Sequence, residues 1–463
     1  MRAVWWIIKI AILVAVAIWL ANRPGAVAVE WQGYVVETSV GVLIVAVAAL
    51  MLVAAFLYRL WRGAARTPGR WRNYRQRSKR ERGYKALTYG MVAVAAGDPQ
   101  AARRQARKAD ALLNEPPLTM LLSAQAAQLN GDDNAARSYF EAMLKRPETE
   151  FLGLRGLLNQ SLRQDDPTRA LSLARRAKDL RPETPWVQRA VLELEIRQRQ
   201  WAEAQASLSS ARKSGVIDEQ TARRWTTAIL MERSRIDEAG GDSHAAQRHA
   251  HRALKLSPDF VPAAVREARL LARTGKDRQA QKVIDAAWTR APHPDLMAAW
   301  LDLAPADEAP LDRVKRVERL HRLQPDNAES LTALAEAELA AKLWGAARGH
   351  LLKVERKAPT RRVYHLLADL EQAEHGDTAA ARAWLAKASD SPPDPTWVCG
   401  QCGTTAIAWT ALCGACGAFD TLAWRSPTEG LHLPAAGGSG APLLTAPVAP
   451  GGRPLVDGEG SAA

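Results

Sequence analysis

Four cysteines near the C-terminus have the clearest chemical signature in this chain. They form two Cys-x-x-Cys pairs and are the only cysteines among its 463 residues: Cys399, Cys402, Cys413 and Cys416. Two such pairs with a short spacer can bring four sulfur atoms to tetrahedral positions around one metal ion. Gly403 and Gly417 follow the pairs, and glycine permits the left-handed turn that points backbone amides at sulfur. The spacing predicts a metal site.

Zinc in a structural role is the predicted occupant. Four thiolates suit zinc or a single iron, but zinc has no redox liability, and four protein ligands leave no position open for catalysis. Disulfides are the competing interpretation, which a reducing cytoplasm disfavours. The segment between the pairs, with Trp409, is expected to form a short β-hairpin. Trp397, Phe419 and Trp424 are expected to cover the site, because so small a module has almost no core of its own.

The elements before this module follow a repeat with a period of about 34 residues. One copy consists of Ala170, Ala174, Ala177 and Pro182; the other copies keep the same spacing, and most of them also have the proline. The first positions are Ala135, Ala170, Ala204, Ala246, Ala280, Arg313, Ala347 and Ala380, with a weaker copy at Ala102. The small residue lets two helices approach closely, and the proline stops the second helix. The longer interval after Ala204 predicts longer helices near 221–238 or a loop at 214–218.

These repeats predict helix–turn–helix units of the tetratricopeptide kind over residues 86–391. Glycine is expected to end the first helix, and the aspartate or a neighbour to cap the second, at Gly131-Asp132-Asp133, Gly240-Gly241-Asp242, Gly275-Lys276-Asp277 and Gly376-Asp377. Such units stack into a solenoid with an extended concave surface. Surfaces of this kind bind proteins, so we expect cytoplasmic or membrane-associated proteins as partners in the solenoid groove.

No other pattern points to catalysis. The sequence has no phosphate-binding loop, dinucleotide fingerprint or Cys-x-x-Cys-His haem attachment motif. Its histidines include a group at His244, His249 and His251, and the others are scattered along the repeats: His293, His321, His350, His365 and His375. We interpret them as solvated helix residues and predict a protein that is not an enzyme.

Two apolar runs near the N-terminus predict membrane helices. Val4–Leu20 is interrupted only by Lys9, and Val40–Leu57 contains no charge; each approaches the roughly 20 residues that span a bilayer. A cleaved signal peptide is the alternative for the first run, since residues 26–28 offer small residues for cleavage. Residues 1–61 are therefore expected to form a two-helix transmembrane hairpin, with a small strand or a reentrant turn in its connector.

A basic cluster follows from Arg59 to Lys85 and carries most of the net charge of +14. Its members are Arg59, Arg62, Arg66, Arg70, Arg72, Arg75, Arg77, Lys79, Arg80, Arg82 and Lys85. Positive residues beside membrane helices stay in the cytoplasm. We therefore predict a bacterial inner-membrane, multi-pass protein whose repeats are cytoplasmic and whose basic residues lie at the membrane surface. The repeats are close to neutral, which argues against nucleic-acid binding.

The N-terminal features resemble the HemY family of bacterial inner-membrane proteins. The resemblance lies in the Trp5-Trp6 opening, the two apolar runs, the Gly25–Val36 connector and the basic cluster. It implies a non-enzymatic role associated with haem biosynthesis, with tetrapyrrole-synthesis enzymes as partners. The four-cysteine module departs from family members that stop after the repeats and is similar to the rubredoxin-type ribbon of the lipopolysaccharide assembly regulator LapB. A regulatory adaptor for envelope synthesis is therefore an alternative, and a haem-binding carrier is another.

Together these observations predict an all-α chain with a small C-terminal β module. The expected order is a transmembrane hairpin at 1–61, a basic segment at 62–85, the solenoid at 86–391, the metal ribbon at 395–424 and a disordered tail at 425–463.

Overall fold

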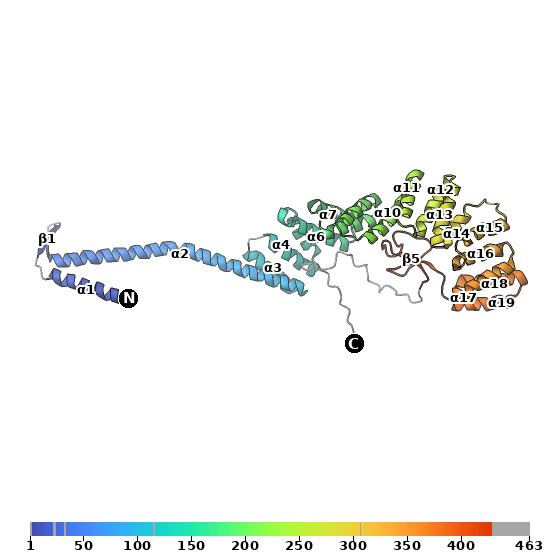
Figure 1. The fold of residues 1–463 in the computed structure, drawn as a ribbon. Coiled ribbons are helices and arrows are strands. Elements are labelled where there is room, and N and C mark those ends of the chain that lie inside the picture. Colours follow the sequence, from blue (N-terminus) through green and yellow to red (C-terminus); the bar gives the residue numbers. More distant parts are fainter. Residues whose placement is uncertain (1, 22–24, 32–33, 114–115, 306, 428–463) are drawn as a thin grey trace. The chain divides into compact units, whose positions relative to one another are not determined.

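The computed structural model describes residues 2–21, 25–31, 34–113, 116–305 and 307–427 (Figure 1). It divides the chain into two compact units, residues 1–139 and 140–463. The first unit contains α1 (Arg2–Ala21), β1 (Ala26–Trp31), β2 (Tyr34–Ser39), α2 (Val40–Ala95), α3 (Pro99–Leu112) and α4 (Pro116–Leu129), and the boundary between the units falls within α5 (Asp133–Met143).

The second unit is a repeat solenoid followed by a small sheet. Its helices are α6 (Pro147–Arg163), α7 (Pro167–Leu180), α8 (Pro185–Arg197), α9 (Trp201–Lys213), α10 (Glu219–Ala239), α11 (Ser243–Leu256), α12 (Val261–Arg273), α13 (Asp277–Arg290), α14 (Pro294–Leu301), α15 (Pro310–His321), α16 (Ala328–Ala340), α17 (Trp344–Lys357), α18 (Arg361–His375) and α19 (Thr378–Asp390). The strands are β3 (Thr396–Cys399), β4 (Thr405–Ala406) and β5 (Leu422–Arg425).

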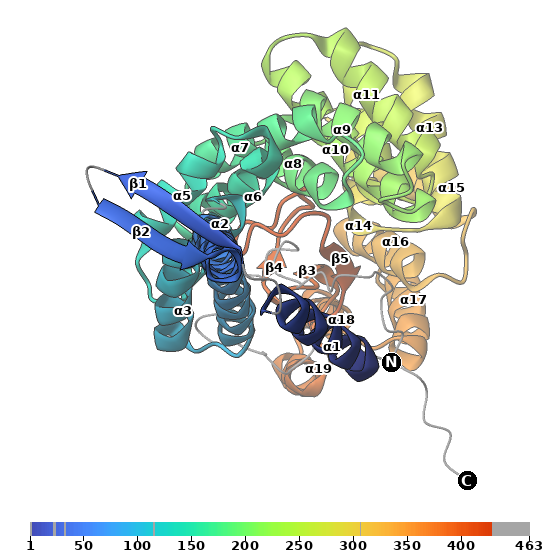
Figure 2. The same cartoon turned by 90° about the vertical axis from the view of Figure 1, so that its left-hand side faces the viewer.

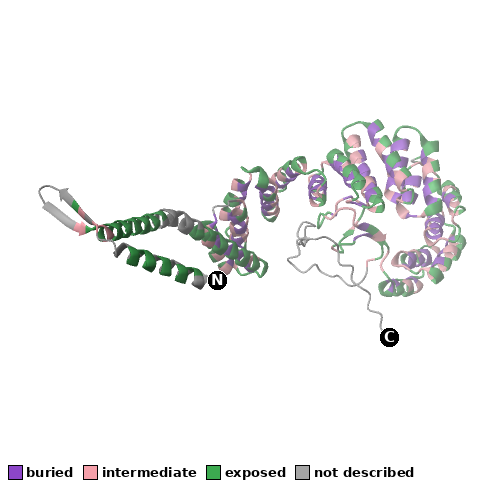
Figure 3. Cartoon of the chain, turned by 60° about the vertical axis from the view of Figure 1, so that its left-hand side comes forward, coloured by how far each residue is buried: buried purple, intermediate pink, exposed green. Residues whose placement is uncertain are grey.

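The dominant element of the first unit is α2, a single helix of 56 residues. Within it, Val40–Arg62 is long and apolar enough to cross a membrane, and it is the one described segment that meets this test. Its apolar side chains are exposed (Figure 3). The helix continues through the basic cluster, and its last turns pack on α3 and α4 through Ala86, Leu87 and Ala93. One helix therefore joins the membrane-length segment to the first repeat.

The prediction of two membrane helices is corrected to one membrane-length apolar helix among the described residues. The first run lies in α1, a helix of 20 residues, and only Val40–Arg62 of α2 meets the length and composition of a membrane helix among the described residues. The expectation of a multi-pass protein is thus reduced to one membrane-length apolar helix among the described residues. The connector forms the predicted strand, because β1 and β2 pair as an antiparallel hairpin with Val29 opposite Val36.

The buried alanines of the repeat pattern explain how the helices pair. Ala170, Ala174 and Ala177 are at most 1% exposed in α7, and they pack with Leu154, Leu158 and Val191 of the neighbouring helices. The same offsets bury Ala246, Ala250 and Ala253 in α11. Because a methyl group is all that separates the backbones at these positions, the helices lie close and stack in register.

The turns between helices follow the predicted capping chemistry with one exception. Asp132, Asp242 and Asp377 accept hydrogen bonds from the first amides of α5, α11 and α19, and Gly131, Gly241 and Gly376 have positive φ angles. At α13 the N-cap residue is Lys276, which makes no side-chain cap bond, rather than Asp277. The long interval after Ala204 is taken up by α10, which has 21 residues.

The close approach of α6 to α5 gives a test of this packing. A Cβ added at Gly156 would lie 2.2 Å from the Phe140 ring, whereas one at Gly349 in α17 would meet nothing within 4 Å. Gly156→Ala should therefore lower the stability of the repeat region by about 1–3 kcal/mol, the usual cost of overpacking. Gly349→Ala should be neutral or stabilising by up to about 1 kcal/mol through helix propensity. Thermal unfolding followed by circular dichroism distinguishes them, and equal effects would contradict the packing described.

Candidate metal centre

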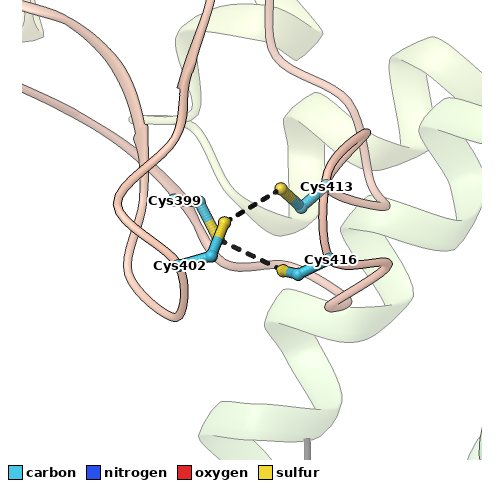
Figure 4. A group of neighbouring side chains, drawn as sticks. All are labelled: Cys399, Cys402, Cys413 and Cys416. Carbon is cyan, nitrogen blue, oxygen red and sulfur yellow. Dashed lines mark hydrogen bonds between the residues drawn. The ribbon is translucent and has the colours of Figure 1, made fainter. Parts of the chain in front are cut away.

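The four predicted cysteines converge on one point at the C-terminal end of the second unit (Figure 4). Their sulfur atoms all lie within 4.8 Å of one another. Across the two pairs, the Sγ atoms of Cys399 and Cys416 are 3.8 Å apart, and those of Cys402 and Cys413 are 3.7 Å apart. Tetrahedral zinc with Zn–S bonds of about 2.3 Å requires sulfur atoms about 3.8 Å apart. The arrangement therefore fits a four-thiolate metal ion, and it does not distinguish zinc from iron.

The backbone around the sulfurs is shaped by two tight turns. Gly403 and Gly417 adopt the predicted left-handed conformation, with φ of 73° and 69°. Their amides donate to the carbonyl oxygens of Cys399 and Cys413. The Gln401 amide donates to the Cys399 sulfur over 3.4 Å. Both Cys-x-x-Cys pairs thus have the turn that presents two sulfurs to a common centre.

The thiol groups do not have equal acidities. Burial opposes ionisation of Cys399, but hydrogen bonds from Thr421 and from the amides of Cys402 and Gln401 outweigh it and lower the pKa of this thiol to about 6. Burial raises the pKa of Cys416 to about 12. Since thiolates are the ligands of a metal ion, Cys399 is prepared for binding, while Cys416 must lose its proton as the metal binds.

A three-stranded sheet with the order β4-β3-β5 holds the first cysteine pair. Trp397 of β3 lies opposite Ala406 of β4 and Trp424 of β5. The segment between the pairs is therefore not a hairpin of its own, as the spacing had suggested. Arg425, expected to begin the tail, pairs with Thr396 as the last residue of β5. The rest of the expected tail from residue 428 lies outside the described residues.

This ribbon (residues 395–425) lies on the inner side of the arc made by α8–α18 (Figure 2). Trp409 is 2% exposed and meets Phe260, with ring centroids 4.9 Å apart. Phe419 contacts Trp225 and Trp201 at 5.6 and 6.3 Å. The ribbon and the helices share one buried apolar cluster, so the ribbon side chains are buried by packing on the solenoid.

The aromatic residues expected to cover the metal also pack against the solenoid. Trp397 and Trp424 pack against each other and against His293 at the start of α14, with ring centroids between 4.1 and 5.7 Å apart. His293 is 5% exposed and caps α14 by accepting from the Asp295 amide. The expectation that it is a solvated helix histidine is wrong, because ribbon side chains from over 100 residues away bury it.

Polar contacts hold the ribbon and the segment just before it against the solenoid. Arg224 and Arg235 of α10 bond the Asp420 carboxylate and the Trp409 carbonyl over 2.9 and 2.7 Å. The Ala411 amide donates to Glu232. At the other end, the Arg362 amide donates to Asp394 just before β3. These bonds join segments up to 196 residues apart, and neither the local spacing of residues nor the composition predicts them.

The inner face of the solenoid is thus partly covered by the same chain. The expectation that partners bind in this groove remains a prediction, and the structure adds that the ribbon covers the stretch from α8 to α14. Among the clustered histidines, His249 pairs with Asp237 and His251 with Glu267, on separate partners.

The basic cluster falls along the middle of α2. Arg59, Arg62, Arg75, Arg77, Lys79, Arg80, Arg82 and Lys85 are exposed there. The side chains of Arg66, Arg70 and Arg72 lie outside the described residues. Their predicted contact with a membrane surface is untested by the fold.

Comparison with known proteins bears on the N-terminal part first. Residues 25–131 match the family model for the HemY protein N-terminus. This stretch runs from the β1–β2 hairpin through α2 to the end of α4. Protein HemY of Escherichia coli (strain K12) is 32% identical over 126 residues, which cover 26% of this chain and 31% of that protein. The match supports the resemblance for the N-terminal segment and leaves most of the solenoid outside it.

A second relative is similar over nearly the whole length. The probable magnetosome protein Mms48 of Magnetospirillum gryphiswaldense is 27% identical over 425 residues, which cover 92% of this chain and 93% of that protein. Among solved structures, a tetratricopeptide repeat protein from Parabacteroides merdae aligns with 15% identity over 52% of this chain and 93% of its own, with a TM-score of 0.26.

The four-sulfur geometry predicts one metal ion per chain. The full chain purified and loaded with cobalt should show thiolate charge-transfer absorbance at one equivalent, because tetrahedral sulfur sites accept either ion. Cys402→Ser should abolish the signal. Ile407→Ala, which changes a fully exposed side chain between the pairs, should leave it intact. Full absorbance in the serine variant would contradict a four-cysteine site.

Proposed function

We propose that this protein is a membrane-anchored, non-enzymatic scaffold that binds other proteins and is associated with haem (tetrapyrrole) biosynthesis. The observation that carries the proposal is the HemY N-terminal match, because it spans the hairpin, the membrane-length helix and the first repeats as one segment. A repeat solenoid supports it physically, since such folds supply long binding surfaces rather than enclosed reaction centres.

The proposed anchor is Val40–Arg62 in the bacterial inner membrane, with the repeats in the cytoplasm. The basic cluster follows this segment directly, and cytoplasmic flanks of membrane helices are enriched in lysine and arginine. Each basic residue near anionic headgroups adds about 1 kcal/mol of attraction. Because α2 is continuous from the anchor into the first hairpin, the membrane segment would hold the first repeat directly.

The four-cysteine centre is proposed to hold structural zinc. Its sulfur spacing fits tetrahedral coordination, and four protein ligands leave no position for a substrate. The metal would hold the turn between Cys413 and Cys416, on which Asp420 and Ala411 depend for their contacts with α10. Zinc is thus assigned a role in shaping the scaffold.

A second candidate follows from the near full-length similarity to Mms48. That relative is named a probable magnetosome protein, and the alignment includes most of the repeats. The same architecture would then serve as a scaffold at a magnetosome membrane. The two candidates share a mechanism and differ in the partners that are bound.

The orientation is tested by reporters fused after residue 463. A C-terminal green fluorescent protein should fluoresce and a C-terminal alkaline phosphatase should be inactive, because the basic flank keeps the repeats in the cytoplasm. As a control, the same two reporters are fused after an additional membrane-spanning segment that places them in the periplasm, where the phosphatase should be active and the fluorescent protein dark. An active phosphatase on the unmodified chain would overturn the topology.

Partner identity is tested by photo-crosslinking in living cells. A crosslinking residue is placed at Leu152, which is exposed on α6. The helix α6 is the first helix of its hairpin, and the helices α8, α10 and α12 that contact the ribbon are also first helices of their hairpins. Tetrapyrrole-synthesis enzymes should be captured there and not from the same residue at exposed Lys353 in α17, the second helix of its hairpin. Capture of magnetosome proteins would select the second candidate. Capture of an envelope-synthesis enzyme would reject both candidates in favour of an envelope adaptor. A Soret absorbance band on the purified protein would reject both in favour of a haem carrier.

A further inference from the structure

The ribbon depends on two separate sets of interactions, one inside it and one with the solenoid. Inside, the sulfurs and a few turns set its shape. Outside, it contacts a docking face formed by Trp201, Trp225, Phe260 and His293, together with Arg224, Glu232 and Arg235. The buried ribbon side chains Trp397, Trp409 and Leu422 belong to one apolar cluster with residues of the solenoid.

The second cysteine pair connects these two sets directly. The Cys413 amide donates to the Ala418 carbonyl, and the Asp420 amide donates to the Ala411 carbonyl, which closes the loop that carries Cys413 and Cys416. Ala411 and Asp420, at the base of this loop, are the residues that bond Glu232 and Arg224 of α10. A metal ion that fixes the two sulfurs therefore also fixes both contacts.

The docked state is held less firmly than a domain core. A cavity of about 510 Å³ remains between the ribbon and the helices, with Leu192, Ile196 and Trp225 on one side and Leu412 and Phe419 on the other. The indole N–H groups of Trp397 and Trp409 are buried without an acceptor among the described residues. Each unpaired buried donor lowers the stability of the docked state, because it has lost its hydrogen bonds to water without gaining an acceptor. The side chain of Arg224 is 60% exposed, so its ion pair with Asp420 adds little.

We propose that metal binding and ribbon docking form one coupled equilibrium, so that the metal determines whether the docking face is covered by the ribbon or open to another protein. This inference rests on the proposed scaffold function and gives that scaffold a regulated surface. With metal bound, the ribbon is the occupant of the inner face between α8 and α14. Without metal, the loop loses its shape, the contacts at Ala411 and Asp420 are lost, and the side chains of Trp225 in α10 and Phe260, the N-cap of α12, become accessible.

The coupling has a consequence that an independent zinc module would not share. If metal strengthens docking, docking must strengthen metal binding by the same factor, because linked equilibria are reciprocal. A substitution on the docking face, remote from every cysteine in the sequence, must then weaken zinc binding. Phe260→Ala removes the ring that meets Trp409, whereas Phe151→Ala removes a ring of the same type that meets Trp186 in α8, outside the ribbon.

Zinc affinity of the full chain in nanodiscs, measured by competition with a chromogenic chelator, tests the proposal. Phe260→Ala should lower the affinity by about 10-fold or more, within the span typical of coupled sites, and Phe151→Ala should leave it unchanged. Arg235→Ala, at the rim of the face, provides a second variant if Phe260→Ala loses helical circular dichroism. Wild-type affinity in both docking-face variants, or an equal loss in the Phe151 control, would overturn the coupling.

Hydroxyl-radical footprinting supplies an independent readout on the same samples. Stripping zinc should increase the labelling of Trp225 and Phe260 several-fold and leave Phe151 unaffected, because only the first two are covered by the ribbon. Unchanged labelling of Trp225 after zinc removal would overturn the proposal. Failure here is distinguishable from failure of the scaffold function, because the reporter and crosslinking experiments do not depend on zinc affinity.

Discussion

The close approach of paired helices at buried alanines is the constraint on which the rest of the second unit depends. Where Ala170, Ala174 and Ala177 lie in α7, no larger side chain separates the helix backbones, and leucine and valine fill the remaining grooves. The same contact recurs along the chain and generates a curved array. The curvature in turn creates an inner face, which is what gives the C-terminal ribbon a place to bind.

The ribbon shows how a module too small for its own core can still be ordered. Metal coordination would supply local shape, and the solenoid supplies the apolar partners that the ribbon lacks. The ribbon in turn covers apolar surface of the solenoid, because it packs with residues of α8, α10 and α12 and with His293 at the start of α14. Asp394, just before the ribbon, bonds the first turn of α18. A chain that ended after α19 would leave the docking face of α10 and α12 uncovered.

At the other end, α2 performs two tasks with one helix. Its uncharged segment Val40–Leu57 is apolar on all sides, as a lipid-facing segment must be, and its last turns present Ala86, Leu87 and Ala93 to α3 and α4. Gly83 and Gly90 allow this contact, because a Cβ at either would lie 2.5 Å from a leucine of the packed elements. The basic cluster separates the two halves and marks where the environment of the helix changes.

The sequence by itself determined the features that depend on local spacing. The alanine offsets, the Gly-Asp turns and the two Cys-x-x-Cys pairs predicted the helical repeats and the four-sulfur cluster, because each is encoded within about 34 residues by periodicity or ligand geometry. Only the tertiary structure decided where the ribbon lies, why His293 is buried and that Arg224 meets Asp420. Those contacts join residues from over 100 to 196 positions apart, and they arise from the curvature that accumulates over several hairpins, which no single repeat contains.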